Sequence, residues 1–442
     1  MRQAKAVVRS KTQAYSLISM NRAPEQPQDP LKWCGALALA FWALVLWNIG
    51  IPTEPYFDEV HYLPAARDLL ALSEYSNREH PLFGKEMIAL GIVLFGDNPW
   101  GWRLFSSLAG TFSLFALMRM VWFGTLDRFA TIASGILVAT GFHLFVHSRI
   151  AMLDIFMVAG LAAAFWQCAA AMREPETGRK RLAIAGVALG LAMAAKWNAL
   201  VVAAVPGVAF LILRWLAGRR RLLLSRRGMP VPGMTLLEAG IWLGLLPLTV
   251  YWATYLPGYY FQTDAITDGI VAHHRLMLDL QTQVLRSHPY QSTWAEWVLN
   301  WRSIWYLYEP IDGAQRGVIL IGNPLTMLLG LPAMLWCAWQ GMVKRLPMHG
   351  AVAVLYSVSL GFWMFAAKPV QFYYHYFLPG TVLLVGLALA LSDMRSAGWK
   401  RTSTGVVVAS MLIFAFFYEI LAAEPLAGPM SFQTWTWLPS WK

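Results

Sequence analysis

Charged residues are scarce in this chain. Asp, Glu, Lys and Arg make up 13% of its 442 residues, whereas soluble globular domains carry about 25%. An ordinary soluble fold is therefore excluded. In place of charge the sequence has apolar runs of about 20 residues, long enough to cross a bilayer as helices. Because these runs are continuous rather than alternating, a β-barrel is disfavoured. We predict an all-α integral membrane protein.

Cysteine and the common nucleotide-binding motifs are also rare or missing. Cys34, Cys168 and Cys337 fall in three different apolar segments, which excludes a disulfide framework and a cysteine metal site. The chain contains no P-loop, no glycine-rich dinucleotide motif, no HExxH and no GxSxG. If this protein transfers a chemical group, the donor is therefore expected to be held in the membrane rather than to be a cytosolic nucleotide.

Eleven segments are predicted to span the membrane. They are residues 31–51, 99–118, 129–147, 153–172, 182–197, 198–216, 235–255, 321–342, 348–366, 373–392 and 404–423. The transmembrane domain is therefore placed at residues 31–423. Residues 1–30 contain three prolines and no sustained apolar face, so they are predicted to form a flexible cytoplasmic tail.

Basic residues are distributed unevenly between the two sides of this predicted bundle. With the N-terminus in the cytoplasm, the cytoplasmic segments hold 23 of the 35 Lys and Arg residues but only 7 of the 24 Asp and Glu residues. This is the positive-inside bias, so the basic charge indicates topology rather than nucleic-acid binding. Two large loops, residues 52–98 and 256–320, then lie outside. The tail at residues 424–442 also lies outside, and its three tryptophans indicate an interfacial anchor.

The first outer loop places two adjacent acids close to the end of a predicted span. They are Asp58 and Glu59 in the stretch FDEVHY, residues 57–62. One alternative is a solvated loop whose charges avoid the bilayer; the other is a general base beside a second carboxylate. Adjacent residues do not share a face of a helix or strand. We therefore predict different roles for the two acids, one in chemistry and one toward a partner such as an arginine.

The rest of this loop contains two short apolar segments and a polar turn between them. The stretches VHYLPAARDLL and GKEMIALGIVLF can each form an amphipathic helix at the membrane interface. Between them, the proline after His80 favours an extended backbone, and Gly84 allows a tight turn before Lys85. The loop is thus predicted to present acids, a histidine and a lysine over the membrane surface.

Several charged residues lie at the outer ends of the predicted spans. Ionisable groups near a span are costly unless they are paired or hydrated, so each is a functional candidate, with snorkelling to the interface as the alternative. They are Arg103, Arg149, Asp154, Lys196 and Lys368. All five lie on the same side as the loop acids. A cluster of cations there is suited to an anionic head group, and a phosphate is the natural choice.

The second outer loop mixes aromatic and polar residues. Its candidate binding residues are His288, Tyr290, Gln291 and Glu309. Aromatic faces interspersed with polar groups suit a sugar or an extended peptide, but they also suit packing at the membrane interface. The spacing of these residues alone leaves the choice open.

Six stretches, taken together and in order, resemble the protein O-mannosyltransferase family, within the GT-C class of membrane glycosyltransferases. They are FDEVHY, EHPLFGKEMIALG, FGDNPWGWRL, SRIAMLDIFM, AKWNAL and HPYQSTW with the later IWYLYE. The likeness extends from about residue 40 to about residue 380. It is to the smaller bacterial members, which lack the inserted luminal β-trefoil domain. One departure is Phe83, since the family commonly has HPPLGK where this chain has HPLFGK.

The resemblance implies a multi-pass protein of the cytoplasmic membrane with its catalytic site on the outer side. It implies a mannose donor carried on a polyprenyl or dolichyl phosphate and a protein Ser or Thr hydroxyl as acceptor. Asp58 matches the catalytic base, Glu59 the adjacent acid, and Arg103 an arginine that pairs with Glu59 or with the donor phosphate. His80 and Lys85 match a motif near the donor, and His288 and Tyr290 match the motif of the second outer loop.

The implied reaction is an inverting displacement in which one carboxylate removes the proton of the acceptor hydroxyl. The phosphate leaves without protonation, so the second carboxyl group that hydrolytic glycosidases need as an acid is not required. No compact ligand set appears in the sequence, and we expect a site without a metal or other cofactor. Two alternatives remain: a GT-C enzyme acting on a lipid or glycan, and a transporter of lipid-linked sugars. Transporters commonly have repeats and charges at mid-membrane, whereas this chain has neither.

Overall fold

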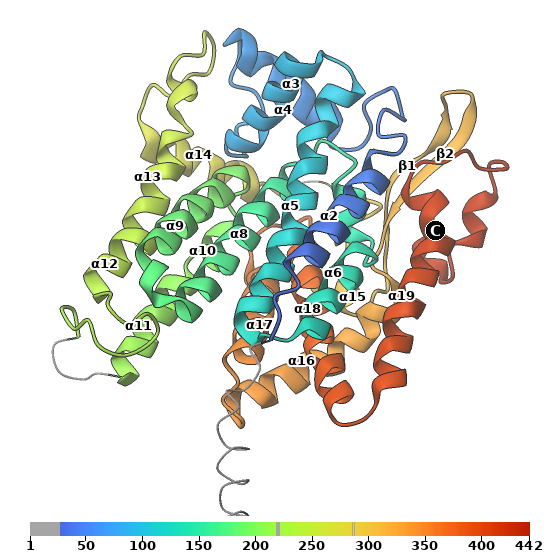
Figure 1. Cartoon of the computed structure of the whole chain (residues 1–442). Coiled ribbons are helices and arrows are strands. Elements are labelled where there is room, and N and C mark those ends of the chain that lie inside the picture. Colours follow the sequence, from blue (N-terminus) through green and yellow to red (C-terminus); the bar gives the residue numbers. More distant parts are fainter. Residues whose placement is uncertain (1–26, 218–221, 285, 287) are drawn as a thin grey trace, which may run out of the picture.

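The computed structural model describes residues 27–442 except 218–221, 285 and 287 (Figure 1). Most of the predicted cytoplasmic tail therefore lies outside the described residues. Helices dominate the fold, and eight of those in the described part are long and apolar enough to cross a membrane. They are α5 (Pro99–Thr125), α8 (Leu153–Arg173), α10 and α11 (Ala199–Ala203, Val205–Ala217), α12, η2 and α13 (Leu236–Gly240, Ile241–Leu245, Leu246–Ala253), α16 (Pro324–Met342), α17 (Pro347–Phe365), η4 and α18 (Tyr373–Tyr376, Phe377–Ser396), and α19 (Lys400–Leu421).

The prediction of a helical membrane protein is confirmed. The other three predicted spans are also helical, but they are shorter or more polar: α2 (Leu31–Leu46), α6 with α7 (Arg128–Ala139, His143–His147), and α9 (Gly178–Ala195). The α9 helix begins with three basic residues in its first turn. The count of eleven spans therefore stays a prediction.

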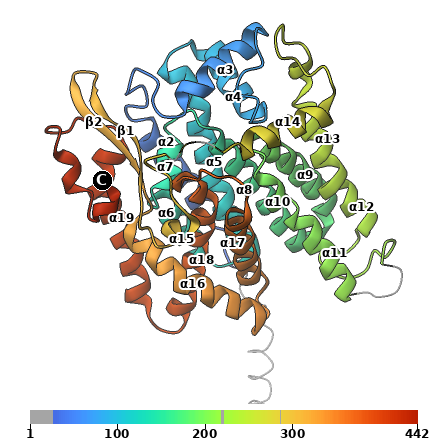
Figure 2. The ribbon, with the colours of Figure 1, turned by 180° about the vertical axis from the view of Figure 1, so that it is seen from behind.

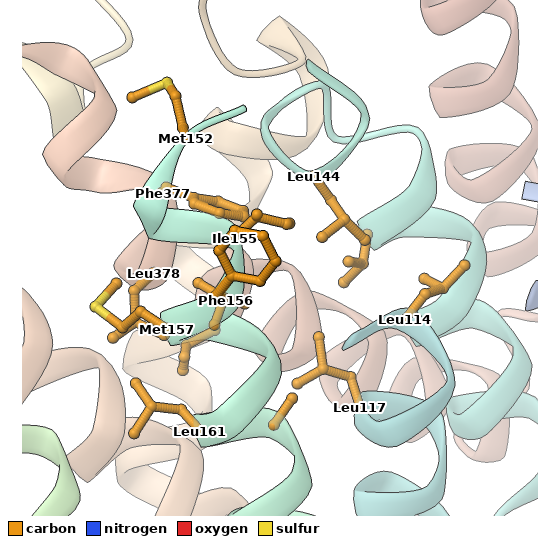
Figure 3. Packing of buried hydrophobic residues seen from close by; sticks show 14 of the residues in the cluster. Leu114, Leu117, Leu144, Met152, Ile155, Phe156, Met157, Leu161, Phe377 and Leu378 are labelled. Carbon is orange, nitrogen blue, oxygen red and sulfur yellow. The ribbon is translucent and has the colours of Figure 1, made fainter. Parts of the chain in front are cut away.

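The centre of the bundle is formed by α18, whose most apolar stretch is 89% buried. It packs against α16, α17 and α6, while α8 packs against α5 and α9. Figure 3 shows leucines of α5 and α8 facing Phe377 and Leu378 of α18. Close packing in this layer fixes the position of the start of α8, and with it the position of Asp154 in the first turn of that helix.

Two shorter helices, α3 (Glu59–Ala71) and α4 (Phe83–Phe95), lie at one end of the bundle, beyond the long helices (Figures 1 and 2). A third, α14 (Ile270–Thr282), lies lower in these views, near the upper end of α9. The two amphipathic segments predicted in the first outer loop therefore do form helices, while their position at a membrane interface remains a prediction. Asp58 is the residue immediately before α3, and Glu59 opens its first turn, where a carboxylate suits the helix dipole.

The second outer loop contains a β-hairpin, which was not predicted. Strands β1 (Ile304–Ile311) and β2 (Ala314–Leu320) pair antiparallel, with Ile304 opposite Leu320 and Ile311 opposite Ala314. Asp312 and Gly313, both with positive φ, form the two-residue turn. An Asp-Gly pair between two apolar runs is a strong hairpin signal.

The C-terminal tail packs against the base of this hairpin. Trp435 and Trp441 are 5% and 3% exposed, whereas Trp437 is 49% exposed. The indole Nε1 of Trp441 donates to the Asn300 carbonyl at 3.0 Å, and its own carbonyl accepts from the indole of Trp305 at 3.0 Å. Two of the three tail tryptophans are thus inside the protein, which leaves only Trp437 placed for an anchoring role.

Candidate active site

The two adjacent acids of the first outer loop have separate environments. Glu59 and Arg103 form a bidentate ion pair, with both nitrogen–oxygen distances at 2.8 Å and both side chains fully buried. Arg103 also donates to the carbonyls of Ile49 and Pro52, at 3.0 and 2.7 Å. The amide of Ala151 donates to Glu59 at 2.9 Å. The predicted arginine partner of Glu59 is therefore present, and the pair joins the end of α2, α5 and the start of α8.

Asp58, by contrast, has no ion-pair partner among the residues that the structure describes. Within the described residues, its single side-chain hydrogen bond comes from the hydroxyl of Tyr62, 3.3 Å from Oδ2. Burial raises the pKa of the Asp58 carboxyl, the positive charge of Lys196 opposes that rise, and the negative charge of Asp154 adds to it. Nearby charges therefore act on the Asp58 carboxylate, but no salt bridge in the described part of the chain engages it. A general base needs such a carboxylate, because its oxygen must be available to accept a proton.

A second buried ion pair lies near Asp58. The ammonium of Lys196, at the end of α9, is 2.6 Å from Asp154 at the start of α8, and both side chains are less than 7% exposed. The same ammonium lies 5.0 Å from the ring centroid of Tyr374. The predicted pair of outer-end charges on these two spans is therefore brought together. The ion pair places the Lys196 ammonium, whose charge is balanced by Asp154, near the Asp58 carboxylate.

Lys368 supplies a more accessible cation. It is half-buried in the segment after α17, and its ammonium donates to Oε1 of Gln281 on α14 at 2.9 Å. Burial lowers the pKa of Lys368 to about 8, the cation of Lys196 adds to that effect, and the acids Asp58 and Asp154 oppose it. Lys368 is therefore positively charged at neutral pH and has no carboxylate partner among the described residues, which suits it to a phosphate.

The loop between α3 and α4 is held by Lys85. This lysine is fully buried, and its ammonium donates to the carbonyls of Asn77 and His80 at 2.7 and 3.1 Å. Burial lowers the pKa of Lys85 to about 7. The His80 ring lies edge-to-face with Tyr62 at 5.9 Å, and its buried Nδ1 has no partner in the described part of the chain. Lys85 thus fixes the loop, while His80 faces the surroundings of Asp58.

Three candidate residues of the second outer loop lie beside the segment that follows α17 and contains Lys368. Gln291 donates to the Pro369 carbonyl at 3.3 Å, and the exposed ring of His288 lies 5.1 Å from that of Phe372. Tyr290 is half-buried next to His288. Phe372 in turn stacks on Tyr374, 5.5 Å away. An aromatic path therefore leads from the predicted second-loop motif toward Asp58.

Two predicted site residues are used elsewhere. The guanidinium of Arg149 donates to the carbonyls of Val45, Trp47 and Ala422, at 2.6, 2.6 and 3.1 Å. It therefore caps the ends of α2 and α19, whose last carbonyls lack helical partners. Glu309 is exposed on β1, opposite Arg316 and near the hairpin turn. In the part of the chain that the structure describes, neither residue forms a hydrogen bond or ion pair with the residues around Asp58.

We define the Asp58 cluster by the side chains whose contacts or charges converge on this carboxylate. Its members are Asp58, Tyr62, His80, Asp154, Lys196, Lys368 and Tyr374. Tyr62 and Tyr374 were not predicted. Tyr62 could have been found, because residues four apart share a helix face. Chemically, the cluster combines a free base with cations that can stabilise a leaving anion.

Comparison with solved structures shows the fold. The chain resembles the Saccharomyces cerevisiae protein O-mannosyltransferase Pmt1-Pmt2 complex bound to the sugar donor, with a TM-score of 0.77, 14% identity, and coverage of 94% of this chain and 93% of that one. It also resembles ArnT from Cupriavidus metallidurans bound to undecaprenyl phosphate, with a TM-score of 0.54, 15% identity, and coverage of 85% and 63%. The fold is that of the GT-C membrane glycosyltransferases.

Sequence comparison then shows which proteins the chain is similar to. The family model for dolichyl-phosphate-mannose-protein mannosyltransferase matches residues 93–260. Curated relatives are the polyprenol-phosphate-mannose–protein mannosyltransferases of Mycolicibacterium smegmatis, 27% identical over 89% of this chain and 90% of theirs, and of Mycobacterium tuberculosis, 28% identical over 94% and 93%. The chain is thus similar to the protein O-mannosyltransferases, and it is a glycosyltransferase.

Proposed function

We propose that this enzyme transfers mannose from a polyprenyl-phosphate carrier to Ser or Thr hydroxyls of proteins. The relatives named for this donor and acceptor match 89% and 94% of this chain, which supports the proposal. The observation that carries the proposal is that Asp58, which has no ion-pair partner among the described residues, lies close enough to the half-buried Lys368 for its charge to act on that ammonium. A base for the acceptor and a cation for the donor phosphate are the two groups that this transfer requires.

In the proposed mechanism, the acceptor oxygen attacks the anomeric carbon from the face opposite the phosphate. Asp58 takes the hydroxyl proton as the new carbon–oxygen bond forms, and the carbon–phosphate oxygen bond breaks with inversion. The polyprenyl phosphate leaves with the bonding electrons, and Lys368 stabilises the charge that gathers on it. The Lys196–Asp154 pair stays neutral overall and fixes the surroundings of both groups.

The proposed location is the cytoplasmic membrane, with the N-terminus inside and the active site and C-terminus outside. Figure 1 supports this orientation: α3, α4 and the hairpin lie at one end of the bundle, and the basic connections from α16 to α17 and from α18 to α19 lie at the other. Such connections belong on the cytoplasmic side. Acceptor proteins would then meet the enzyme during or after export.

The test of this function is transfer of radiolabelled mannose from polyprenyl-phosphate-mannose to a Ser/Thr-rich peptide by membranes that contain the enzyme. Labelled peptide is the expected product. Labelled lipid or glycan without labelled peptide would replace the protein acceptor by one of those classes. No labelled product of any kind would contradict the mannosyl donor.

The pH profile of kcat/KM is predicted to be bell-shaped. Asp58 must be ionised, and its raised pKa moves the acid limb above the usual range of an aspartate. Lys368 is protonated below its pKa of about 8 and loses its charge above it, so donor binding weakens on the alkaline side. Lys368→Arg removes that titration because arginine stays charged, and the alkaline limb should move to higher pH. An unchanged alkaline limb in this variant would remove Lys368 from donor binding.

We also propose that the transfer needs no metal. The leaving group is a monoester phosphate whose developing charge can be met by Lys368, so no divalent cation is required for charge balance. Transfer measured after EDTA treatment is expected to equal that of untreated enzyme. A loss that Mg²⁺ or Mn²⁺ restores would contradict this proposal.

A further inference from the structure

One buried residue outside the predicted motifs contacts two parts of the Asp58 cluster. These are the loop that carries His80 and the segment that carries Lys368. Gln281 lies near the end of α14 and is only 7% exposed. Other positions of the same helix are open, since Val271 and Leu278 are 65% and 54% exposed. A buried amide on an otherwise half-exposed helix is expected to have specific partners.

Both ends of the Gln281 amide have such partners, and they come from opposite parts of the chain. Its Nε2 donates to the Glu79 carbonyl at 3.0 Å. Glu79 lies in the first outer loop and immediately precedes His80. Its Oε1 accepts from the Lys368 ammonium at 2.9 Å. One side chain therefore joins the first outer loop, α14 and the segment after α17.

The bond to Lys368 occurs in a crowded electrostatic environment. The charges that act on this ammonium are those of Lys196, Asp58, Asp154 and Glu79. The neighbouring His80 and His375 are themselves influenced by the Lys368 cation. In the described part of the protein, none of the three carboxylates among them is within ion-pair distance of the Lys368 ammonium. The neutral carbonyl of Gln281 is thus the direct hydrogen-bond acceptor that orients the ammonium.

We infer that Gln281 is a positioning residue for donor binding, which holds the Lys368 ammonium and the His80 loop at a fixed separation around Asp58. This inference rests on the proposed function, because it assigns Lys368 to the donor phosphate. It makes α14 a structural part of the donor site, although no residue of that helix belongs to the predicted motifs.

Two substitutions separate orientation from simple packing. Gln281→Leu keeps the approximate volume but removes both hydrogen bonds, and we expect KM for the donor to rise about 10-fold, as for loss of a hydrogen bond to a charged group. Gln281→Glu places a carboxylate against Lys368, which favours the charged ammonium, so the alkaline limb of kcat/KM should move to higher pH. In a Lys368→Arg background the same change should leave that limb where Lys368→Arg alone puts it.

Gln283 offers a matched control two residues further along. It is the same residue type but exposed. Gln283→Leu and Gln283→Glu are expected to leave both KM for the donor and the alkaline limb as in the wild type.

Binding of a short-chain polyprenyl phosphate to the purified enzyme provides a readout that does not depend on transfer. Gln281→Leu should weaken this binding about 10-fold by the same loss of orientation. If binding weakens but the wild type transfers no mannose to peptide, the inference stands and the proposed acceptor or sugar fails. If Gln281→Leu binds and transfers normally and Gln281→Glu leaves the alkaline limb unmoved, while Lys368→Arg moves it, the inference is overturned and the function stands.

Discussion

Replacing Asp58 with Asn should lower kcat by about 10²- to 10⁴-fold, the usual contribution of a general base. Asn has the shape of Asp and can still accept the hydroxyl of Tyr62, which donates to Asp58 in the native enzyme. It cannot take the proton of the acceptor hydroxyl at neutral pH. The loss should therefore appear in kcat and not in KM for the donor. Mannosyl transfer to a Ser/Thr peptide, measured at several donor concentrations, gives both constants.

The control for this variant is a nearby acid with no role in the cluster. Glu54 is exposed four residues before Asp58, and Glu54→Gln is expected to keep wild-type activity. Binding of polyprenyl phosphate to Asp58→Asn should also match the wild type, which shows that the protein is folded. Full transfer by Asp58→Asn would move the base to another residue of the cluster, and the Asp154 carboxylate would then be the next candidate.

The division of labour between the two adjacent acids was predictable from the sequence. Because side chains of neighbouring residues point apart, Asp58 and Glu59 could not both face one site, and the structure gives only Glu59 an arginine. The helical ranges were also predictable, since membrane spans have a simple hydropathy signal. Both inferences depend on local properties of the chain.

Contacts between distant segments were not predictable in the same way. Gln281 and Lys368 are 87 positions apart, and nothing near either one indicates the other. Arg149 was assigned to the donor because it lies at the outer end of a span, but helix ends also expose carbonyls, and those compete for a guanidinium. A single sequence shows which residues carry charge. It does not show which of the available acceptors each charge will reach.

The second large effect is expected when the Glu59–Arg103 pair is broken. Glu59→Gln leaves a fully buried guanidinium without its counter-charge, and removal of one partner of a buried pair commonly costs about 3–5 kcal/mol. Arg103→Met should be at least as destabilising, because the carbonyls of Ile49 and Pro52 also lose their donor. Thermal unfolding of the purified protein in detergent measures both effects. Arg67→Met, which removes an exposed ion pair with Asp97, is the control and should cost little.

The double variant Glu59→Gln with Arg103→Met tests whether this pair acts only through stability. Removing both charges eliminates the unpaired ion, so the double variant should be more stable than either single variant. It should remain below the wild type, since the carbonyls that Arg103 satisfies stay without a donor. Transfer, however, should stay low. The pair holds Ala151, Pro52 and the first turn of α3 together, and Asp58 is the residue immediately before that turn. A double variant that regains stability and also regains kcat would show that the geometry of Asp58 is set elsewhere. Recovery of stability alone would make Glu59 and Arg103 positioning residues for the base.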